Sequence, residues 1–162
     1  MTNLEYSLRS ATGADVAEVT ALVNAAYRHY VERIGMLPRP MTDDYTEVIR
    51  SSQVTVAESH GTIIGVIVLA INGEGFLIDN VAVHPSHRGK GLGKALLEFA
   101  EAEAWRAGFD SIYLYTHEKM TENLALYTRI GYIEYDRRSQ GEFSLVYMRK
   151  PLEGRAVYRP NC

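Results

Sequence analysis

One stretch, residues 76–105, constrains the fold of this 162-residue chain more than any other. Residues 76–83 have the apolar and β-branched composition of a strand, and residues 95–105 have the spacing of an amphipathic helix. Between them lies a turn of glycines and basic residues, 88–94. The first amides of a helix have no intrahelical acceptor, and the helix dipole adds partial positive charge there. The junction therefore predicts an anion site, with a phosphate or pyrophosphate as its ligand.

The composition of this turn supports the same prediction. Its glycines are Gly89, Gly91 and Gly93, and its basic residues are Arg88, Lys90 and Lys94. Glycines leave the main-chain amides open to a phosphate, and the basic residues add full charges. A Walker A loop needs Ser or Thr after its Gly-Lys, but Ala95 follows Lys94 here. A dinucleotide fingerprint has glycines at one, three and six, whereas these glycines fall at one, three and five.

The rest of the chain is organised as alternating strands and helices. Strands are predicted at residues 4–8, 53–58, 62–71, 76–83, 111–116, 132–136 and 142–148. Helices are predicted from Thr12 to Ile34, from about 45 to 49, from Leu92 to just before Gly108 and from 121 to 129. Because a strand, helix, strand order usually makes a parallel crossover, we expect strands 76–83 and 111–116 to be parallel. The prediction is one α/β domain with a mixed sheet over residues 1–150, followed by a tail, 151–162, whose order stays open.

Composition excludes several classes of function. The formal net charge is −3, from 17 basic and 20 acidic residues, which gives no general attraction to nucleic acid or membrane. Cys162 is the only cysteine, and no apolar run reaches about 18 residues, so we expect a soluble cytoplasmic protein without disulfides. His84 and His87 with Asp79 make a poor metal site, because a proline stands between the histidines and no further ligands follow. No metal is expected.

With these elements in place, the chain resembles the GNAT superfamily of N-acetyltransferases. The cofactor motif of that family is Gln or Arg, two residues, Gly, one residue, then Gly or Ala, and residues 88–93 match it. Residues 81–85, Val-Ala-Val-His-Pro, are similar to the usual strand ending before the motif. Residues 123–132 resemble the downstream pattern of Asn, Ala, Tyr, Gly and an aromatic. The element order resembles the family over about residues 4–150.

The resemblance implies a fold and a cofactor. The implied order is strand, two helices, three strands, helix, strand, helix and two strands, with the fourth and fifth strands splayed apart. The cofactor is acetyl-coenzyme A, whose pyrophosphate binds the glycine turn while its pantetheine arm lies along strand 76–83. The residues implied to bind it are Val81, Ala82, Val83, Arg88, Gly89, Lys90, Gly91, Leu92, Gly93, Lys94 and Asn123. The alternative for the glycines is that they only permit a tight turn and close packing.

Acetyl transfer to an amine needs a base for the ammonium and an acid for the leaving thiolate. Tyr127 matches the tyrosine of the family, and a phenol with a reference pKa of about 10 is protonated at neutral pH; its alternative role is a core aromatic. Asp79 is the first candidate for the base, because a carboxylate within an apolar strand needs a partner or a task. An ordered water is the other candidate base. The alternative role of Asp79 is a structural hydrogen bond with a buried amide or hydroxyl. His117 and Glu118 are further candidates for the base.

The acceptor is the least constrained part of the prediction. Tyr30, near the end of the first helix, and His117 are candidates for the acceptor side. Small-molecule amines, peptide N-termini and lysines all stay open, as does a homodimer. No Cys or Ser has the setting of a nucleophile, which favours direct attack by the amine. The alternative function is a non-catalytic acyl-coenzyme A-binding module that regulates a partner protein.

Overall fold

The computed structural model describes residues 4–152, which form two compact units. The first unit contains the residues up to Ala70 together with Asp79–Phe99, and the second contains Ile71–Ile78 together with the residues from Ala100 on. The helices are α1 (Val16–Ile34), α2 (Tyr45–Ser51), α3 (Leu92–Arg106) and α4 (Thr121–Arg129). The strands are β1 (Ser7–Ser10), β2 (Gln53–Ser59), β3 (Thr62–Asn72), β4 (Gly75–Val83), β5 (Ser111–His117), β6 (Ile133–Gln140) and β7 (Phe143–Pro151).

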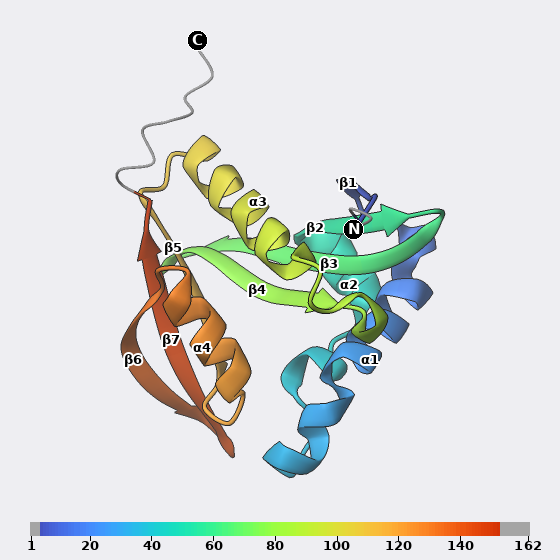
Figure 1. The fold of residues 1–162 in the computed structure, drawn as a ribbon. Coiled ribbons are helices and arrows are strands. Elements are labelled where there is room, and N and C mark those ends of the chain that lie inside the picture. Colours follow the sequence, from blue (N-terminus) through green and yellow to red (C-terminus); the bar gives the residue numbers. More distant parts are fainter. Residues whose placement is uncertain (1–3, 153–162) are drawn as a thin grey trace. The chain divides into compact units, whose positions relative to one another are not determined.

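The strands form a mixed sheet in the order β1-β2-β3-β4-β5-β7-β6 (Figure 1). The pairing between β4 and β5 is parallel, with Leu77 opposite Tyr113 and Ile78 opposite Leu114. The pairs β1 with β2, β2 with β3, β5 with β7 and β6 with β7 are antiparallel. The mixed α/β fold and the parallel crossover through α3 are therefore confirmed.

In the first unit, helices cover both faces of the strands. On one face, residues of α1 and α2 pack against residues of β2, β3 and β4, in a core that includes Val19, Val23, Tyr45, Val54, Val56, Val66, Val68 and Ala82. On the other face, a Cβ at Gly65 of β3 would lie 3.1 Å from Leu92 and 3.2 Å from Leu96 of α3. The glycine lets the beginning of α3 approach the strand closely.

The ends of α1 follow the predicted signals. The Thr12 amide donates to the Asp15 carboxylate at 2.8 Å, in a capping box around the short 3₁₀ turn Gly13–Asp15. Gly35 ends the helix in the left-handed conformation, with a φ of 85°, and its amide donates to the Val31 carbonyl at 2.9 Å. The loop of residues 36–41, which contains Pro38 and Pro40 and is called the proline loop below, makes another 3₁₀ turn, Arg39–Met41. The Asp44 side chain caps α2.

The first strand differs from its prediction. It was expected at residues 4–8, but β1 spans Ser7–Ser10 and pairs with β2 from Ser7 opposite Glu58 to Ser10 opposite Thr55. Its residues are mostly exposed, so hydrophobic alternation carries little information there. The pairing with β2, about fifty residues away in sequence, sets its position.

The second unit surrounds β5, which pairs with β7, and β7 pairs with β6. The helical spacing of residues 92–106 predicts that Glu101 of α3 points outward. Glu101 is instead only 2% exposed, because its carboxylate pairs with the Lys150 ammonium of β7 at 2.7 Å. Leu152, the last described residue, is buried, and its amide donates to the Asp110 carbonyl at 2.8 Å. Residues 153–162 of the predicted tail lie outside the described residues.

None of the helices between residues 4 and 152 combines the length and the apolar character needed to cross a membrane.

Candidate active site

The turn between β4 and α3 is an exposed loop held in an unusual backbone conformation. A 3₁₀ turn, Pro85–His87, precedes it. Gly89 and Gly91 have φ angles of +76° and +83°, in the left-handed region that disfavours residues with a Cβ. Nothing lies within 4 Å of a Cβ placed at either position. These two glycines are therefore required by the path of the backbone, not by close packing, and space is open beside them.

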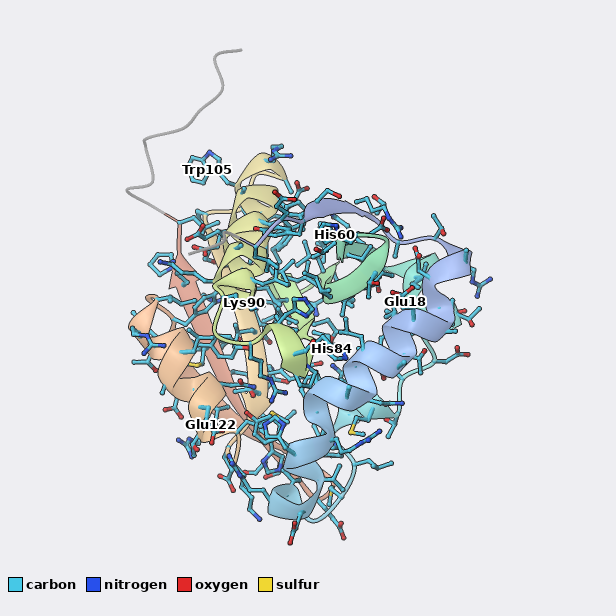
Figure 2. All side chains as sticks on the ribbon, turned by 45° about the vertical axis from the view of Figure 1, so that its right-hand side comes forward. Glu18, His60, His84, Lys90, Trp105 and Glu122 are labelled. Atoms are coloured by element: carbon cyan, nitrogen blue, oxygen red, sulfur yellow. The ribbon has the colours of Figure 1, made fainter. Side chains whose placement is uncertain are left out.

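The loop leads directly into the N-terminus of α3. The first helical hydrogen bond that closes this turn runs from the Ala95 amide to the Gly91 carbonyl at 3.1 Å. The amides of residues 92–94 thus stand at the positive end of a 15-residue helix. Lys90, drawn in Figure 2 on this loop, and Lys94 are exposed beside them. This geometry is suited to binding a phosphate group.

Gly93 has a different role from the two glycines before it. It lies in the first turn of α3, and a Cβ there would stand 3.8 Å from the Val83 side chain, an ordinary packing distance. The end of β4 and the first turn of α3 therefore lie next to each other, and two of the predicted coenzyme-binding residues, Val83 and Gly93, are neighbours in space.

Arg88 is directed differently from the two lysines. Its Nη2 donates to the Ala26 carbonyl of α1 at 2.7 Å and lies 3.5 Å from His29 Nδ1. The Arg88 guanidinium therefore anchors the loop to α1. Lys90 and Lys94, the other two basic residues predicted beside the anion, are exposed.

The main chain of β4 has one edge along β3 and one edge facing away from it. The His84 amide donates to the Ile64 carbonyl of β3 at 2.9 Å, so the main-chain groups of Asn80 and Ala82 also point toward β3. Those of Asp79, Val81 and Val83 point to the opposite edge. The residues that the resemblance assigns to pantetheine binding thus include two, Val81 and Val83, whose main-chain groups line this edge.

Two carbonyls on this edge already accept hydrogen bonds from side chains. The Arg39 Nη2 donates to the Asp79 carbonyl at 3.1 Å, and the Tyr27 hydroxyl lies 3.2 Å from the Val81 carbonyl. The Tyr27 hydroxyl is closer still to Asn80 Oδ1, at 2.8 Å. The main chain of β4 is therefore fixed from α1 and from the proline loop.

Asn80 is the centre of a buried polar network beneath this edge. It is 5% exposed, and its Nδ2 donates to the Tyr45 hydroxyl at 3.1 Å. That hydroxyl donates in turn to the Pro40 carbonyl at 2.6 Å. Burial raises the pKa of Tyr45, so the phenol stays protonated and keeps this role as donor. The network joins α1, α2, the proline loop and β4.

The carboxylate of Asp79 is paired. Its Oδ1 lies 3.0 Å from Arg39 Nη2, and the Nη1 of the same guanidinium lies 2.9 Å from Asp43 Oδ2. Burial raises the pKa of Asp43, and the nearby Arg39 opposes that effect. The Asp79 side chain remains 22% exposed, so solvent or a ligand can reach the predicted base.

The second unit holds the other predicted chemical groups. Tyr127, on α4, is 7% exposed, and its ring meets that of Tyr132 edge-on at 5.8 Å. Asn123 lies one turn earlier, with its Nδ2 3.7 Å from the sulfur of Met120. His117, at the end of β5, is buried, and its Nδ1 accepts from the Lys119 amide at 3.1 Å. Burial lowers the pKa of His117, which favours the neutral ring.

Tyr30, the acceptor-side candidate of the first unit, is 5% exposed. Its ring lies 3.9 Å from the His29 ring and 5.2 Å from the Arg33 guanidinium carbon. These contacts make Tyr30 part of a packed cluster on α1.

The structure thus brings together, within the first unit, the glycine loop, residues 81–83 and Asp79. Tyr127, Asn123 and His117 belong to the second unit. Sequence reasoning missed Arg39 and Asn80 as parts of the site. The one available signal was Asn80 itself, a second polar residue inside an apolar strand.

Within residues 4–152, no three side chains of His, Cys, Asp or Glu are grouped so that they could hold a metal ion. His84 Nδ1 and His87 Nδ1 instead lie 2.7 Å and 2.9 Å from the Ser86 hydroxyl. The two rings therefore belong to a local hydrogen-bonded turn.

A mixed sheet in which a strand leads through an exposed glycine turn into a long helix is typical of proteins that bind a phosphate-bearing nucleotide or coenzyme. A sequence model described as the Acetyltransferase (GNAT) family matches residues 17–132. The chain belongs to this family.

Relatives and solved structures agree with that assignment. An IAA acetyltransferase of Azospirillum brasilense is 34% identical in an alignment of 103 residues, which covers 60% of this chain and 66% of that relative, just under two thirds of its length. The PaiA N-acetyltransferase of Thermoplasma acidophilum, solved with coenzyme A, has a TM-score of 0.76 at 18% identity over 91% of this chain and 99% of that chain. The ribosomal-protein-S18-alanine N-acetyltransferase of Escherichia coli has a TM-score of 0.73 at 18% identity over 96% and 100% of the two chains. At such identities the structures support the fold alone.

Proposed function

We propose that this protein transfers the acetyl group of acetyl-coenzyme A to a primary amine. The observation that carries the proposal is the glycine loop: Gly89 and Gly91 hold it open in the left-handed conformation at the N-terminus of α3, between exposed lysines. In this proposal the amides of residues 88–94 and the Lys90 and Lys94 ammonium groups bind the pyrophosphate. The name of the Thermoplasma structure, an N-acetyltransferase in complex with coenzyme A, supports the same cofactor.

In this proposal the pantetheine arm binds along residues 79–83 of β4, on the edge that faces away from β3. The groups available to it are the amides of Val81 and Val83 and the Val83 carbonyl, because the Tyr27 hydroxyl already contacts the Val81 carbonyl. The neighbouring Ala82 contributes packing from the core side of the strand, where it is 4% exposed. Asn123 keeps the role in coenzyme binding that the resemblance implies.

Transfer proceeds by direct attack. Asp79, or an ordered water, takes a proton from the acceptor ammonium, and the neutral nitrogen attacks the thioester carbonyl carbon. The bond between that carbon and sulfur breaks, and the leaving thiolate takes a proton from the Tyr127 hydroxyl. The nitrogen still carries one proton more than an amide, and it gives this proton to the Tyr127 phenolate. The products are an amide, free coenzyme A and the proton that Asp79 returns to solvent.

A single substitution tests the assignment of the acid. Tyr127→Phe should lower kcat on the order of 10²-fold, the usual contribution of a general acid, and leave the Kd for coenzyme A within about 3-fold. Release of free thiol across a panel of small amines, lysine and peptides measures the rate, and calorimetry measures binding. Tyr132→Phe is the matched control, since it removes a hydroxyl from the adjoining ring.

Each outcome of this experiment is informative. Unchanged turnover in Tyr127→Phe with a working wild type would remove Tyr127 from the mechanism. Tight coenzyme binding by the wild type with no turnover of any amine would instead support the regulatory acyl-coenzyme A-binding module.

The acceptor and the cellular place belong to the proposal as well. Among the similar proteins, one enzyme is named for a ribosomal-protein alanine and another for IAA, so the family fold admits different acceptors. The proposed acceptor is a small-molecule or peptide amine, and Tyr30 and His117 are each a candidate residue for binding it. The cytoplasm suits a chain with a single cysteine. A homodimer is the one protein partner proposed.

A further inference from the structure

Arg39 makes an unusual set of contacts for a loop residue. Its Nη2 donates both to the main-chain carbonyl of Asp79, at 3.1 Å, and to the carboxylate of the same residue, at 3.0 Å. Its Nη1 donates to Asp43 Oδ2 at 2.9 Å. One planar guanidinium therefore fixes the backbone and the side chain of Asp79 together, which restricts the rotation of that carboxylate.

The main chain that carries Arg39 is itself well fixed. Pro38 precedes the 3₁₀ turn Arg39–Met41, and the Met41 amide donates to the Pro38 carbonyl at 2.9 Å. The Arg39 carbonyl accepts from the Thr42 amide at 2.9 Å and from the Thr42 hydroxyl at 2.8 Å. Two prolines further limit the backbone. The guanidinium is therefore presented from a stiff support.

A second connection holds the same loop to the next residue of β4. The side-chain Nδ2 of Asn80 donates to the Tyr45 hydroxyl at 3.1 Å, and that hydroxyl donates to the Pro40 carbonyl at 2.6 Å. Adjacent residues of the loop, 39 and 40, are thus connected to adjacent residues of the strand, 79 and 80. The distance between the loop and the Asp79 main chain is fixed independently of the ion pair.

The three charged groups remain accessible. The side chains of Arg39, Asp43 and Asp79 are 34%, 23% and 22% exposed. These three side chains carry a formal charge of −1 between them. Arg39 therefore orients the Asp79 carboxylate without closing it off from an incoming ammonium.

We propose that Arg39 is a positioning residue that holds the Asp79 carboxylate in the orientation required to accept a proton from the acceptor ammonium. This inference rests on the proposed function, in which Asp79 is the base. Arg39 itself neither gains nor loses a proton: the proton moves from the acceptor nitrogen to an Asp79 oxygen and then to solvent. A displaced carboxylate would lower the rate of this transfer, since a misplacement of about 1 Å can cost on the order of 10²-fold.

A double-mutant cycle tests the proposal. Arg39→Gln should lower kcat about 10-fold to 100-fold in the wild-type background, with the KM for acetyl-coenzyme A within about 3-fold. In an Asp79→Asn background the same substitution should change kcat less than about 2-fold, because the group that it orients is gone. Arg39→Lys should fall between wild type and Arg39→Gln, since a single ammonium cannot make the three contacts.

Controls separate positioning from folding. Arg50→Gln removes a surface guanidinium, 75% exposed and paired with Glu47, and should leave kcat unchanged. Melting temperatures of all variants exclude partial unfolding as the cause of a lower rate. Guanidinium chloride at low millimolar concentration, below any denaturing effect, should partly restore kcat in Arg39→Ala and not in Arg39→Ala with Asp79→Asn.

Three results overturn the inference and leave the proposed function intact. Fully multiplicative effects of Arg39→Gln and Asp79→Asn would show that Arg39 acts elsewhere. A wild-type kcat in Arg39→Gln would show that the orientation is unimportant. A wild-type kcat in Asp79→Asn would remove the base and the positioning role together, yet leave the acetyltransferase assignment intact. Only a wild type that transfers acetyl to no amine overturns the proposed function itself, and Arg39 then loses the role with it.

Discussion

Arg9 fixes a carboxylate at the beginning of α1 with two parallel hydrogen bonds. Its two terminal nitrogens lie 2.8 Å and 3.0 Å from the Asp15 oxygens, and its Nε lies 2.8 Å from Glu58 Oε2 on β2. The Arg9 hydrogen bonds, helped by the Thr12 amide, lower the pKa of Asp15 from 3.8 to about 2. The charged form of Asp15 therefore joins β1, α1 and β2.

This pairing predicts how stability depends on pH. Because the folded pKa of Asp15 lies below its unfolded value, its contribution is complete above about pH 4 and is lost as the pH falls toward about 2. Asp15→Asn should lower the free energy of unfolding by about 1 kcal/mol at pH 6, and the difference from wild type should shrink toward pH 2. Urea unfolding at both pH values measures it.

Asp136→Asn is the control for this experiment. Asp136 also pairs with an arginine, but its side chain is 45% exposed, so solvent screens the pair. Its substitution should change stability far less than Asp15→Asn does. A difference between wild type and Asp15→Asn that stays constant from pH 6 to pH 2 would contradict the assignment to Asp15.

At the scale of elements, the loop between β4 and α3 predicts that one substitution weakens coenzyme A binding while it costs the folded protein little free energy of unfolding. Gly91→Ala places a Cβ in open space but at a φ of +83°, which costs about 1 kcal/mol of stability. The strained loop should also turn its amides away from the pyrophosphate. We expect the Kd for coenzyme A to rise about 10-fold or more, which is about 1.4 kcal/mol, while the weak affinity for pantetheine stays unchanged.

Thermal unfolding and calorimetry measure these two effects. Gly73→Ala is the control, because a Cβ there also meets nothing within 4 Å and its φ is not positive. Equal losses of affinity for coenzyme A and pantetheine in Gly91→Ala would place the pyrophosphate elsewhere.

Most elements could be predicted from the sequence because their signals are local. Thr12 with Asp15 and Gly35 marked the two ends of the first helix, and the glycine turn marked the beginning of α3. Glu101 was misplaced because its partner is Lys150, 49 residues further on, and helical spacing contains no information about a partner on another element. The position of β1 was also mispredicted, because its partner strand, β2, is distant in the sequence.

The candidate site was predicted unevenly for the same reason. The loop at residues 88–94 is contiguous, so glycine content and charge revealed it. The pairing of Arg39 with Asp79 joins residues 40 apart, and no local pattern connects them. A strand carboxylate could be identified as needing a partner, but only the fold shows which cation supplies it.

For the whole molecule, coenzyme binding should appear as a gain in stability. Ligand at 100 times its Kd adds about 2.7 kcal/mol, which for a chain of this size raises the melting temperature by about 5–10 °C. The shift should decrease at higher salt, since Lys90 and Lys94 are exposed. Inorganic phosphate at the same concentration should give a much smaller shift, and an equal shift would argue against coenzyme A as the ligand.

The attachment of the proline loop to β4 has a consequence for how this protein can diverge. Arg39 and Pro40 carry the contacts to the strand, whereas Leu37, just before them, is 49% exposed. Mutations at position 37 can therefore accumulate without loosening the strand. Descendants of this sequence can therefore change this exposed position while they inherit the same attachment of the loop to β4.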